Sequence, residues 1–258
     1  MNFLFVHGFM GSALNWSIVR PKLETLAKKS TIELRTHAVD LLGHASRRSS
    51  QDLKNFQSAH HALTHELFLD IKDYTPTIAL GHSFGIRPLL LLAHQKPDLI
   101  PALIIEDASP ELSPESCAFL QRIIGETPTP FRTRESAREY FDNHYPPQVA
   151  RFLLSNIRSF DNPEINDWRF DREFLLTLLA EAQKMPLWEE LRAYKGQCFI
   201  LTGEKSPLFS DSQVLQKIIQ TRLPQKIDHY EIKNSGHWIH ADQKDEFCRV
   251  LIKIISSI

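Results

Sequence analysis

The feature that most constrains the fold of this chain is the placement of its glycines. Only 9 of 258 residues are glycine, about half the usual share of roughly 7%, so glycine is expected where backbone geometry demands it. Four short apolar or β-rich runs each lead into a glycine-containing turn, at Gly8, Gly81, Gly203 and Gly236. Long stretches with helical apolar spacing separate these runs. This alternation is typical of βαβ units on a parallel sheet.

Outside the middle of the chain, the same patterns predict six strands and four helices. The strands are expected at 2–6, 33–39, 77–81, 101–106, 197–202 and 227–232. The helices are expected at 15–29, 56–72, 84–95 and 242–256. Together they predict an α/β fold with an open, doubly wound, mostly parallel six-stranded sheet and helices on both faces. In such a sheet the ligand site lies beyond the carboxyl ends of the strands.

The alternation of strand and helix patterns stops between residues 110 and 188, a segment rich in proline. Helical patches occur at 116–125, 133–142, 148–159 and 171–183, and no clear strand is visible. We therefore expect a helical insertion between two strands of a single core, with residues 1–109 and 189–258 forming that core.

Composition and charge exclude several classes of protein. The net charge of −1 removes bulk electrostatic attraction to nucleic acid or to a membrane, so neither is an expected partner. The cysteines, Cys117, Cys198 and Cys248, are far apart and form no zinc spacing, and the first residues lack a signal-peptide pattern. We expect a cytoplasmic protein, a monomer or weak homodimer. No cofactor and no metal are expected, because GxGxxG and GxxxxGK[ST] motifs are absent.

The segment Gly81-His82-Ser83-Phe84-Gly85 matches the pattern G-x-S-x-G. It follows a predicted strand and opens a predicted helix, which is the placement that a nucleophile elbow requires. The turn is so tight that the residues two before and two after the serine must lack side chains. The alternative is a plain strand-to-helix turn in which Ser83 only caps the helix. The pattern favours Ser83 as a nucleophile.

Two further segments supply what an acyl-transfer site needs beside its nucleophile. A tetrahedral oxyanion needs two backbone N–H donors, and the amides of Phe84 and of Phe9, in the turn after the first strand, are the natural pair. The general base is expected at His237, which stands beside a glycine between the last strand and the last helix.

Five segments, in this order, resemble the α/β-hydrolase superfamily over nearly the whole chain. They are HGFMGSALNW near the start, DLLGHASRRS at 40–49, GHSFG at 81–85, IIEDASP at 104–110 and NSGHWIHAD at 234–242. The resemblance implies Ser83 as nucleophile, His237 as base, an oxyanion hole at Phe9 and Phe84, and a lid formed by 110–188. The first two strands of the family are expected to be absent, because only six residues precede His7.

The carboxylate of the triad is the open question. The family usually places it a few residues after the strand ending at Gly203, where this chain has Ser206. Three carboxylates are candidates: Asp107, Glu204 and Asp211. We favour Asp107, at the carboxyl end of the strand next to the nucleophile strand. The chain also resembles small bacterial acyl esterases and their mitochondrial relatives, in which a serine at the usual position accompanies an acid on the earlier strand. Ser206 would then be an auxiliary hydroxyl bonded to the histidine or the acid.

A serine nucleophile argues against the dehalogenase and epoxide hydrolase branches, which need a carboxylate there. Apolar residues flank the expected catalytic groups and suggest an acyl pocket: Phe9, Met10, Phe84, Leu208, Phe209 and Trp238. The predicted function is a serine hydrolase that cleaves short-to-medium acyl esters or thioesters through an acyl-enzyme on Ser83.

The sequence is also compatible with two other functions. A lyase resembling the menaquinone-pathway synthase of the superfamily would use Arg87, four residues after Ser83, to bind an anionic substrate. The lack of an aspartate at position 206 counts against that reading. A non-catalytic binding protein on the same fold is the other alternative.

Overall fold

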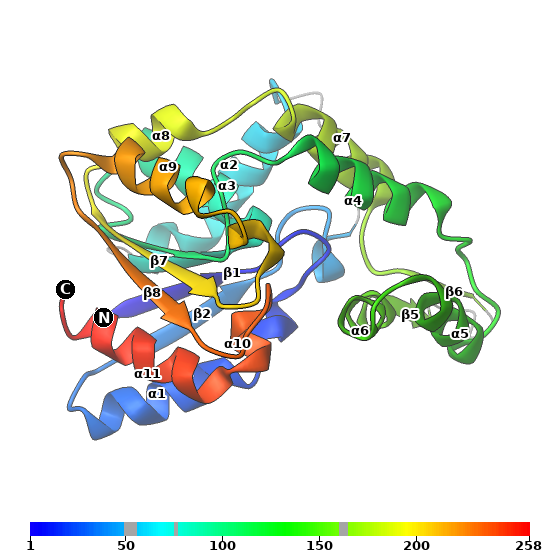
Figure 1. Cartoon of the computed structure of the whole chain (residues 1–258), viewed down its shortest axis with the longest axis horizontal. Helices are drawn as coiled ribbons and strands as arrows, with labels where there is room; N and C mark the ends of the chain where they lie inside the picture. Colours follow the sequence, from blue (N-terminus) through cyan, green and yellow to red (C-terminus); the bar gives the residue numbers. More distant parts are fainter. Residues whose placement is uncertain (49–55, 75–76, 160–164) are drawn as a thin grey trace.

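The computed structural model describes residues 1–48, 56–74, 77–159 and 165–258. Residue 49 of the DLLGHASRRS segment and residues 160–164 of the predicted insertion lie outside the described residues. Within them, the chain forms a central sheet with helices on both faces (Figure 1).

The central sheet has six strands in the order β2-β1-β3-β4-β7-β8, and every neighbouring pair is parallel. The strands are β1 (Asn2–Val6), β2 (Arg35–Val39), β3 (Thr77–His82), β4 (Ala102–Glu106), β7 (Gln197–Gly203) and β8 (Ile227–Ile232). All six predicted strands are confirmed, and β1, the first strand along the chain, leads into His7. The central strands β3 and β4 are buried along their whole length, as expected for a parallel sheet covered on both sides.

Side chains that alternate along β1 divide the core into two parts. Phe3 and Phe5 belong to one cluster, which includes residues of α1 (Val19–Lys29) and α11 (Lys244–Ile255). Leu4 and Val6 belong to the other cluster. Four helices cover that second face: α2 (Ala59–Ile71), α3 (Ile86–Gln95), α8 (Trp188–Ala193) and α9 (Ser212–Arg222) (Figure 1). The apolar runs are therefore buried on both faces, which fixes the register of the sheet.

Most of the segment between β4 and β7 lies beyond the carboxyl ends of the strands, whereas its last helix, α8, lies on the face described above (Figure 1). Its main helices are α4 (Pro114–Glu126), α5 (Arg134–His144), α6 (Pro147–Ser155) and α7 (Arg172–Ala182). The expectation that this segment has no strand is wrong, because β5 (Ile157–Ser159) and β6 (Asn166–Trp168) pair antiparallel. Strands of three residues are too short to show alternation in a sequence.

Several helix boundaries differ from the prediction. The helix expected at 15–29 is split into a 3-10 turn at Ala13–Trp16 and α1. The last predicted helix begins earlier, as α10 (Ile239–Asp242) followed by α11. Helices α8 and α9 were not predicted. No helix in the described part of the chain is both long and apolar enough to cross a membrane.

Candidate active site

Ser83 lies on a sharp turn between β3 and α3. Its φ of 51° falls in the left-handed region, which non-glycine residues rarely adopt and which stores strain at functional sites. The flanking glycines leave the room that the turn needs: a Cβ at Gly81 would lie 2.7 Å from the backbone nitrogen of Ile86, and one at Gly85 would lie 2.6 Å from the carbonyl oxygen of His7. The sequence therefore predicted the shape of this turn correctly.

The turn after β1 packs directly against Ser83. A Cβ added to Gly8 would lie 3.1 Å from the Cβ of Ser83, so the next amide, that of Phe9, is close to the serine. Among the described residues the Phe9 N–H has no hydrogen-bond acceptor, and the Phe84 N–H belongs to the first turn of a helix, where such groups lack intrahelical partners. Within the same residues the half-buried Ser83 hydroxyl makes no hydrogen bond. Two donors and a hydroxyl are thus available to a ligand.

Asp107 stands on the strand next to Ser83. Because β3 and β4 pair His82 with Glu106, the residues that follow them, Ser83 and Asp107, leave the same edge of the sheet side by side. Asp107 is fully buried and also has a positive φ, 46°. Both strand ends thus turn sharply at the edge where the ligand site of such a sheet is expected.

Three donors surround the Asp107 carboxylate. Its Oδ2 lies 2.7 Å from His237 Nδ1 and accepts a hydrogen bond from Ser206 Oγ at 2.6 Å. Its Oδ1 accepts from the Gly203 amide at 3.1 Å. Hydrogen bonds of this kind stabilise the ionised carboxylate in a buried position. The contact with Oδ2 also places a proton on His237 Nδ1 and leaves Nε2 as the acceptor nitrogen.

Close packing brings His237 to this carboxylate. The loop between β8 and α10 lies against the end of β7, where a Cβ at Gly203 would be only 2.2 Å from the Gly236 carbonyl oxygen. The Gly236 amide donates to Asp242 Oδ2 at 2.8 Å, which ties the loop to α10. A side chain at position 203 would push the loop away from the sheet.

The other two candidate carboxylates lie elsewhere. Asp211 is exposed and caps α9 by accepting a hydrogen bond from the Gln213 amide at 2.8 Å. Glu204 is exposed, accepts from the Asn234 amide and forms an ion pair with Lys233 at 3.1 Å. Among the three candidates, the structure brings only Asp107 into contact with the histidine.

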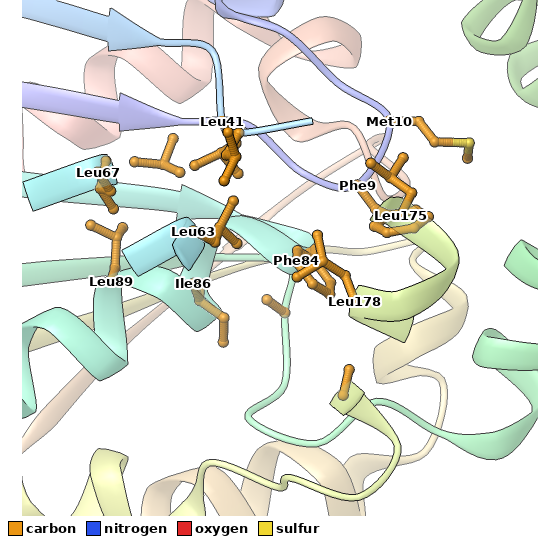
Figure 2. Close-up of a cluster of buried hydrophobic side chains, with 14 of the residues drawn as sticks. Phe9, Met10, Leu41, Leu63, Leu67, Phe84, Ile86, Leu89, Leu175 and Leu178 are labelled. Atoms are coloured by element: carbon orange, nitrogen blue, oxygen red, sulfur yellow. The ribbon is translucent and has the colours of Figure 1, made fainter. Parts of the chain in front are cut away.

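The predicted apolar residues line the surroundings of Ser83. Phe9, Met10 and Phe84 are buried, and the rings of Phe9 and Phe84 are 5.2 Å apart. Figure 2 shows these three side chains together with Leu175 and Leu178 of α7. The apolar surface near the serine is therefore built jointly by the sheet edge and by the segment between β4 and β7.

The remaining predicted apolar residues are half-buried at the rim. The indole of Trp238, next to the histidine, lies 5.3 Å from the ring of Phe152 in α6. Leu208 and Phe209 lie on a 3-10 turn that directly follows Ser206. All three thus stand beside a residue of the acid–histidine group.

Arg87 does not join this group. It is buried, and its guanidinium donates to the carbonyl oxygens of Pro110 at 3.2 Å and Met185 at 2.6 Å, and to His60 Nε2 at 3.2 Å. Its hydrogen bonds thus hold the two ends of the segment between β4 and β7 against α3. The prediction that Arg87 binds substrate disagrees with this position, because its donors already have acceptors within the protein.

The sequence reasoning missed a buried cluster of His82, Glu106 and His240. Glu106 Oε1 accepts from the backbone N–H of His240 at 3.0 Å and from its Nδ1 at 2.8 Å. Burial raises the pKa of Glu106 to about 7 and lowers the pKa values of His82 and His240 to about 3. His82 stands at an unspecified position of the G-x-S-x-G pattern and Glu106 lies inside the IIEDASP segment, and no local pattern indicates that they meet.

A parallel α/β sheet with a strained serine turn and a buried acid–histidine pair at its carboxyl edge defines a fold of the hydrolase type. The chain belongs to the alpha/beta hydrolase family, whose model matches residues 3–250.

Individual relatives are distant in sequence but match nearly the whole chain. It is 26% identical to the sn-1-specific diacylglycerol lipase ABHD11 of Xenopus laevis, over 98% of this chain and 79% of that protein. It is 23% identical to Esterase YbfF of Escherichia coli, over 98% of this chain and 92% of the relative. The structure of a marine microorganism esterase has the same fold, with a TM-score of 0.76, 20% identity, and coverage of 98% of this chain and 94% of that one.

Proposed function

We propose that this protein is a serine hydrolase that cleaves short-to-medium acyl esters or thioesters through an acyl-enzyme on Ser83. The observation that carries the proposal is the 2.7 Å contact between Asp107 Oδ2 and His237 Nδ1, made by a buried carboxylate beside the strained serine turn. Relatives named as esterases and lipases support an ester substrate.

In the proposed reaction Ser83 is the nucleophile, and His237 transfers protons in both halves of the cycle. His237 Nε2 accepts the proton of Ser83 Oγ as the oxygen attacks the carbonyl carbon of the substrate. The N–H groups of Phe9 and Phe84 stabilise the oxyanion of the tetrahedral intermediate. His237 then protonates the leaving alkoxide or thiolate, and the acyl group stays on Ser83. Water then gives a proton to His237 Nε2 as its oxygen attacks the acyl carbon, and His237 returns this proton to Ser83 Oγ when the bond to the acyl group breaks and the acid leaves.

Asp107 has two tasks in this scheme. Its hydrogen bond to Nδ1 holds His237 in the tautomer whose Nε2 can accept a proton, and its charge stabilises the imidazolium formed during attack. Ser206 donates to the same carboxylate oxygen, so it limits the rotation of the carboxylate and helps to stabilise its charge in the protein interior. No step of this reaction requires a metal or a cofactor.

The proposed substrate follows from the surroundings of Ser83. Phe9, Met10 and Phe84 offer apolar contact to an acyl chain, and Leu175 adds a wall from α7 (Figure 2). We assign the segment 110–188 the role of a lid, because its helices α4, α5, α6 and α7 lie beyond the carboxyl edge of the sheet (Figure 1). The lyase alternative is not proposed, since Arg87 is bonded to backbone carbonyl oxygens.

The test is hydrolysis of p-nitrophenyl esters from acetate to octanoate, and of thioesters of the same chain lengths. Wild type is compared with Ser83→Ala and with Ser30→Ala, the same change at an exposed position after α1. We expect wild type and Ser30→Ala to hydrolyse the short esters equally and Ser83→Ala to lose at least about 10³-fold in kcat. Wild-type turnover that survives in Ser83→Ala, or no turnover of any ester or thioester by wild type, contradicts the proposal.

A further inference from the structure

The residues that directly precede Ser83 and Asp107 hold the loop that carries His237. This histidine loop comprises residues 237–240, which run from the turn after β8 into the start of α10. His82 Nε2–H donates to the backbone carbonyl oxygen of His237 at 2.9 Å. Glu106 Oε1 accepts from the backbone N–H and the Nδ1–H of His240. Because His82 and Glu106 are register partners on β3 and β4, both ends of the loop segment that contains His237 are attached to one step of the sheet.

These attachments lie in the protein interior, directly behind the imidazole of His237. His82, Glu106 and His240 are all buried. The ring of His82 packs against the rings of His237 and His240, with centroids 4.8 and 4.9 Å apart. Away from water, a hydrogen bond is stronger, and the loss of one partner leaves the other unpaired in the protein interior, which is unfavourable. Movement of the histidine loop away from His82 and Glu106 would break these buried hydrogen bonds, so they stabilise its observed position.

We propose that His82 and Glu106 are positioning residues for the general base: they fix the backbone of His237 so that its imidazole meets Asp107 and Ser83. The inference rests on the proposed hydrolase function and extends it by two residues that touch no reacting atom. His82 acts through the carbonyl oxygen of His237, and Glu106 acts through His240. Misplacement of a catalytic group by about 1 Å lowers the rate on the order of 10²-fold, so the effect is expected in kcat and not in KM.

The same three side chains also have the composition of a metal site, since one potential ligand atom from each lies within 4.8 Å of the others. Hydrogen bonding is the better interpretation. His240 Nδ1 already donates to Glu106, and His82 Nε2 already donates to a carbonyl oxygen. A metal that bound the atoms engaged in these contacts would displace the hydrogen bonds that hold the histidine loop in place.

The test compares two amides at position 82. In His82→Gln the side-chain NH₂ reaches the place of imidazole Nε2 and restores the donor to His237. In His82→Asn the amide is one methylene shorter and cannot reach it. With p-nitrophenyl butyrate we expect kcat to fall about 10- to 100-fold in His82→Asn and to stay within about three-fold of wild type in His82→Gln. KM stays within about two-fold in both variants.

A pH profile and a spectroscopic measurement separate positioning from simple destabilisation. Both variants are assayed well below their Tm. In His82→Asn the pKa seen in the pH profile of kcat/KM shifts, because the imidazole is no longer aligned with Asp107, whereas the His82→Gln profile matches wild type. Glu106→Gln, which keeps an acceptor for His240, retains activity, and Glu106→Met, which has none, loses kcat.

The downfield proton resonance of His237 Nδ1–H tests the inference without any substrate. We expect it in wild type and in His82→Gln, and we expect it to broaden or vanish in His82→Asn. A wild type that shows this pattern and hydrolyses no ester refutes the proposed function alone. His82→Asn with wild-type kcat, pH profile and resonance overturns the positioning role. Activity that a chelator removes and Zn²⁺ restores overturns it in favour of a metal site.

Discussion

Replacing Asp107 by asparagine removes one charge from the centre of the site and changes its shape little. Asp107 is fully buried and has three donors around it. If the amide oxygen of asparagine accepts from the Gly203 amide, its NH₂ group faces Ser206 Oγ and His237 Nδ1. The serine hydroxyl can turn and accept a hydrogen bond. The histidine can accept only if its proton moves to Nε2, the atom that must take the proton of Ser83.

Asp107→Asn is therefore expected to lower kcat about 10⁴-fold, the loss that a wrong histidine tautomer causes in serine hydrolases. That factor corresponds to about 5.4 kcal/mol of transition-state stabilisation. The assay is steady-state hydrolysis of p-nitrophenyl butyrate, with Asp211→Asn as the matched control. Asp211 only caps α9, and asparagine caps helices as well as aspartate, so the control keeps its activity. Asp107→Asn within ten-fold of wild type, or an inactive control, would refute the reasoning.

Three further predictions follow from individual contacts. Ser206→Ala removes one donor from the buried carboxylate, so kcat should fall about 10-fold at constant KM; unchanged steady-state kinetics would remove Ser206 from the site. Gly85→Ala places a Cβ 2.6 Å from the His7 carbonyl oxygen and should cost about 3 kcal/mol, lowering Tm by about 6–12 °C. Gly125→Ala, whose Cβ meets nothing within 4 Å, should not lower Tm, and equal melting of the two variants would contradict the clash. Burial lowers the pKa values of His7 and His44 to about 4 and 3. Below pH 6.5 these two histidines therefore bind more protons in the unfolded chain than in the folded one. The free energy of unfolding should decrease as the pH is lowered from 6.5 to 4. A Tm that is constant from pH 7.5 to 5 would count against buried neutral histidines.

Much of the sheet could be predicted because four of its strands are short apolar or β-rich runs that lead into glycine-containing turns. Gly81 and Gly203 show why: a side chain at either position would collide with backbone atoms. The β5–β6 pair could not be predicted in the same way. Its strands are three residues long, and neither carries a pattern of its own. Helix α9 was not predicted. Its N-cap is Asp211, which the sequence analysis treated as a candidate catalytic acid.

In the active site, too, residues that stand in local patterns could be predicted and contacts between distant segments could not. Ser83 and His237 stand in local patterns, and Asp107 follows from the position of its strand, so these residues could be singled out from the sequence. Contacts between distant segments could not. No local pattern indicates that His82 contacts the histidine loop, that Glu106 bonds His240, or that Arg87 bonds both Pro110 and Met185. Each of these depends on how the loops beyond the sheet fold over its edge.

Covalent labelling of Ser83 tests the central claim most directly. Diethyl p-nitrophenyl phosphate reacts with an activated serine and leaves a stable diethylphosphoryl group, whose mass and position can be read by intact-protein and peptide mass spectrometry. We expect one adduct per chain, on the peptide containing residues 81–85, with none in Ser83→Ala and much slower labelling in Asp107→Asn. An unlabelled wild type, or an adduct on another residue, would contradict the assignment of Ser83 as the nucleophile.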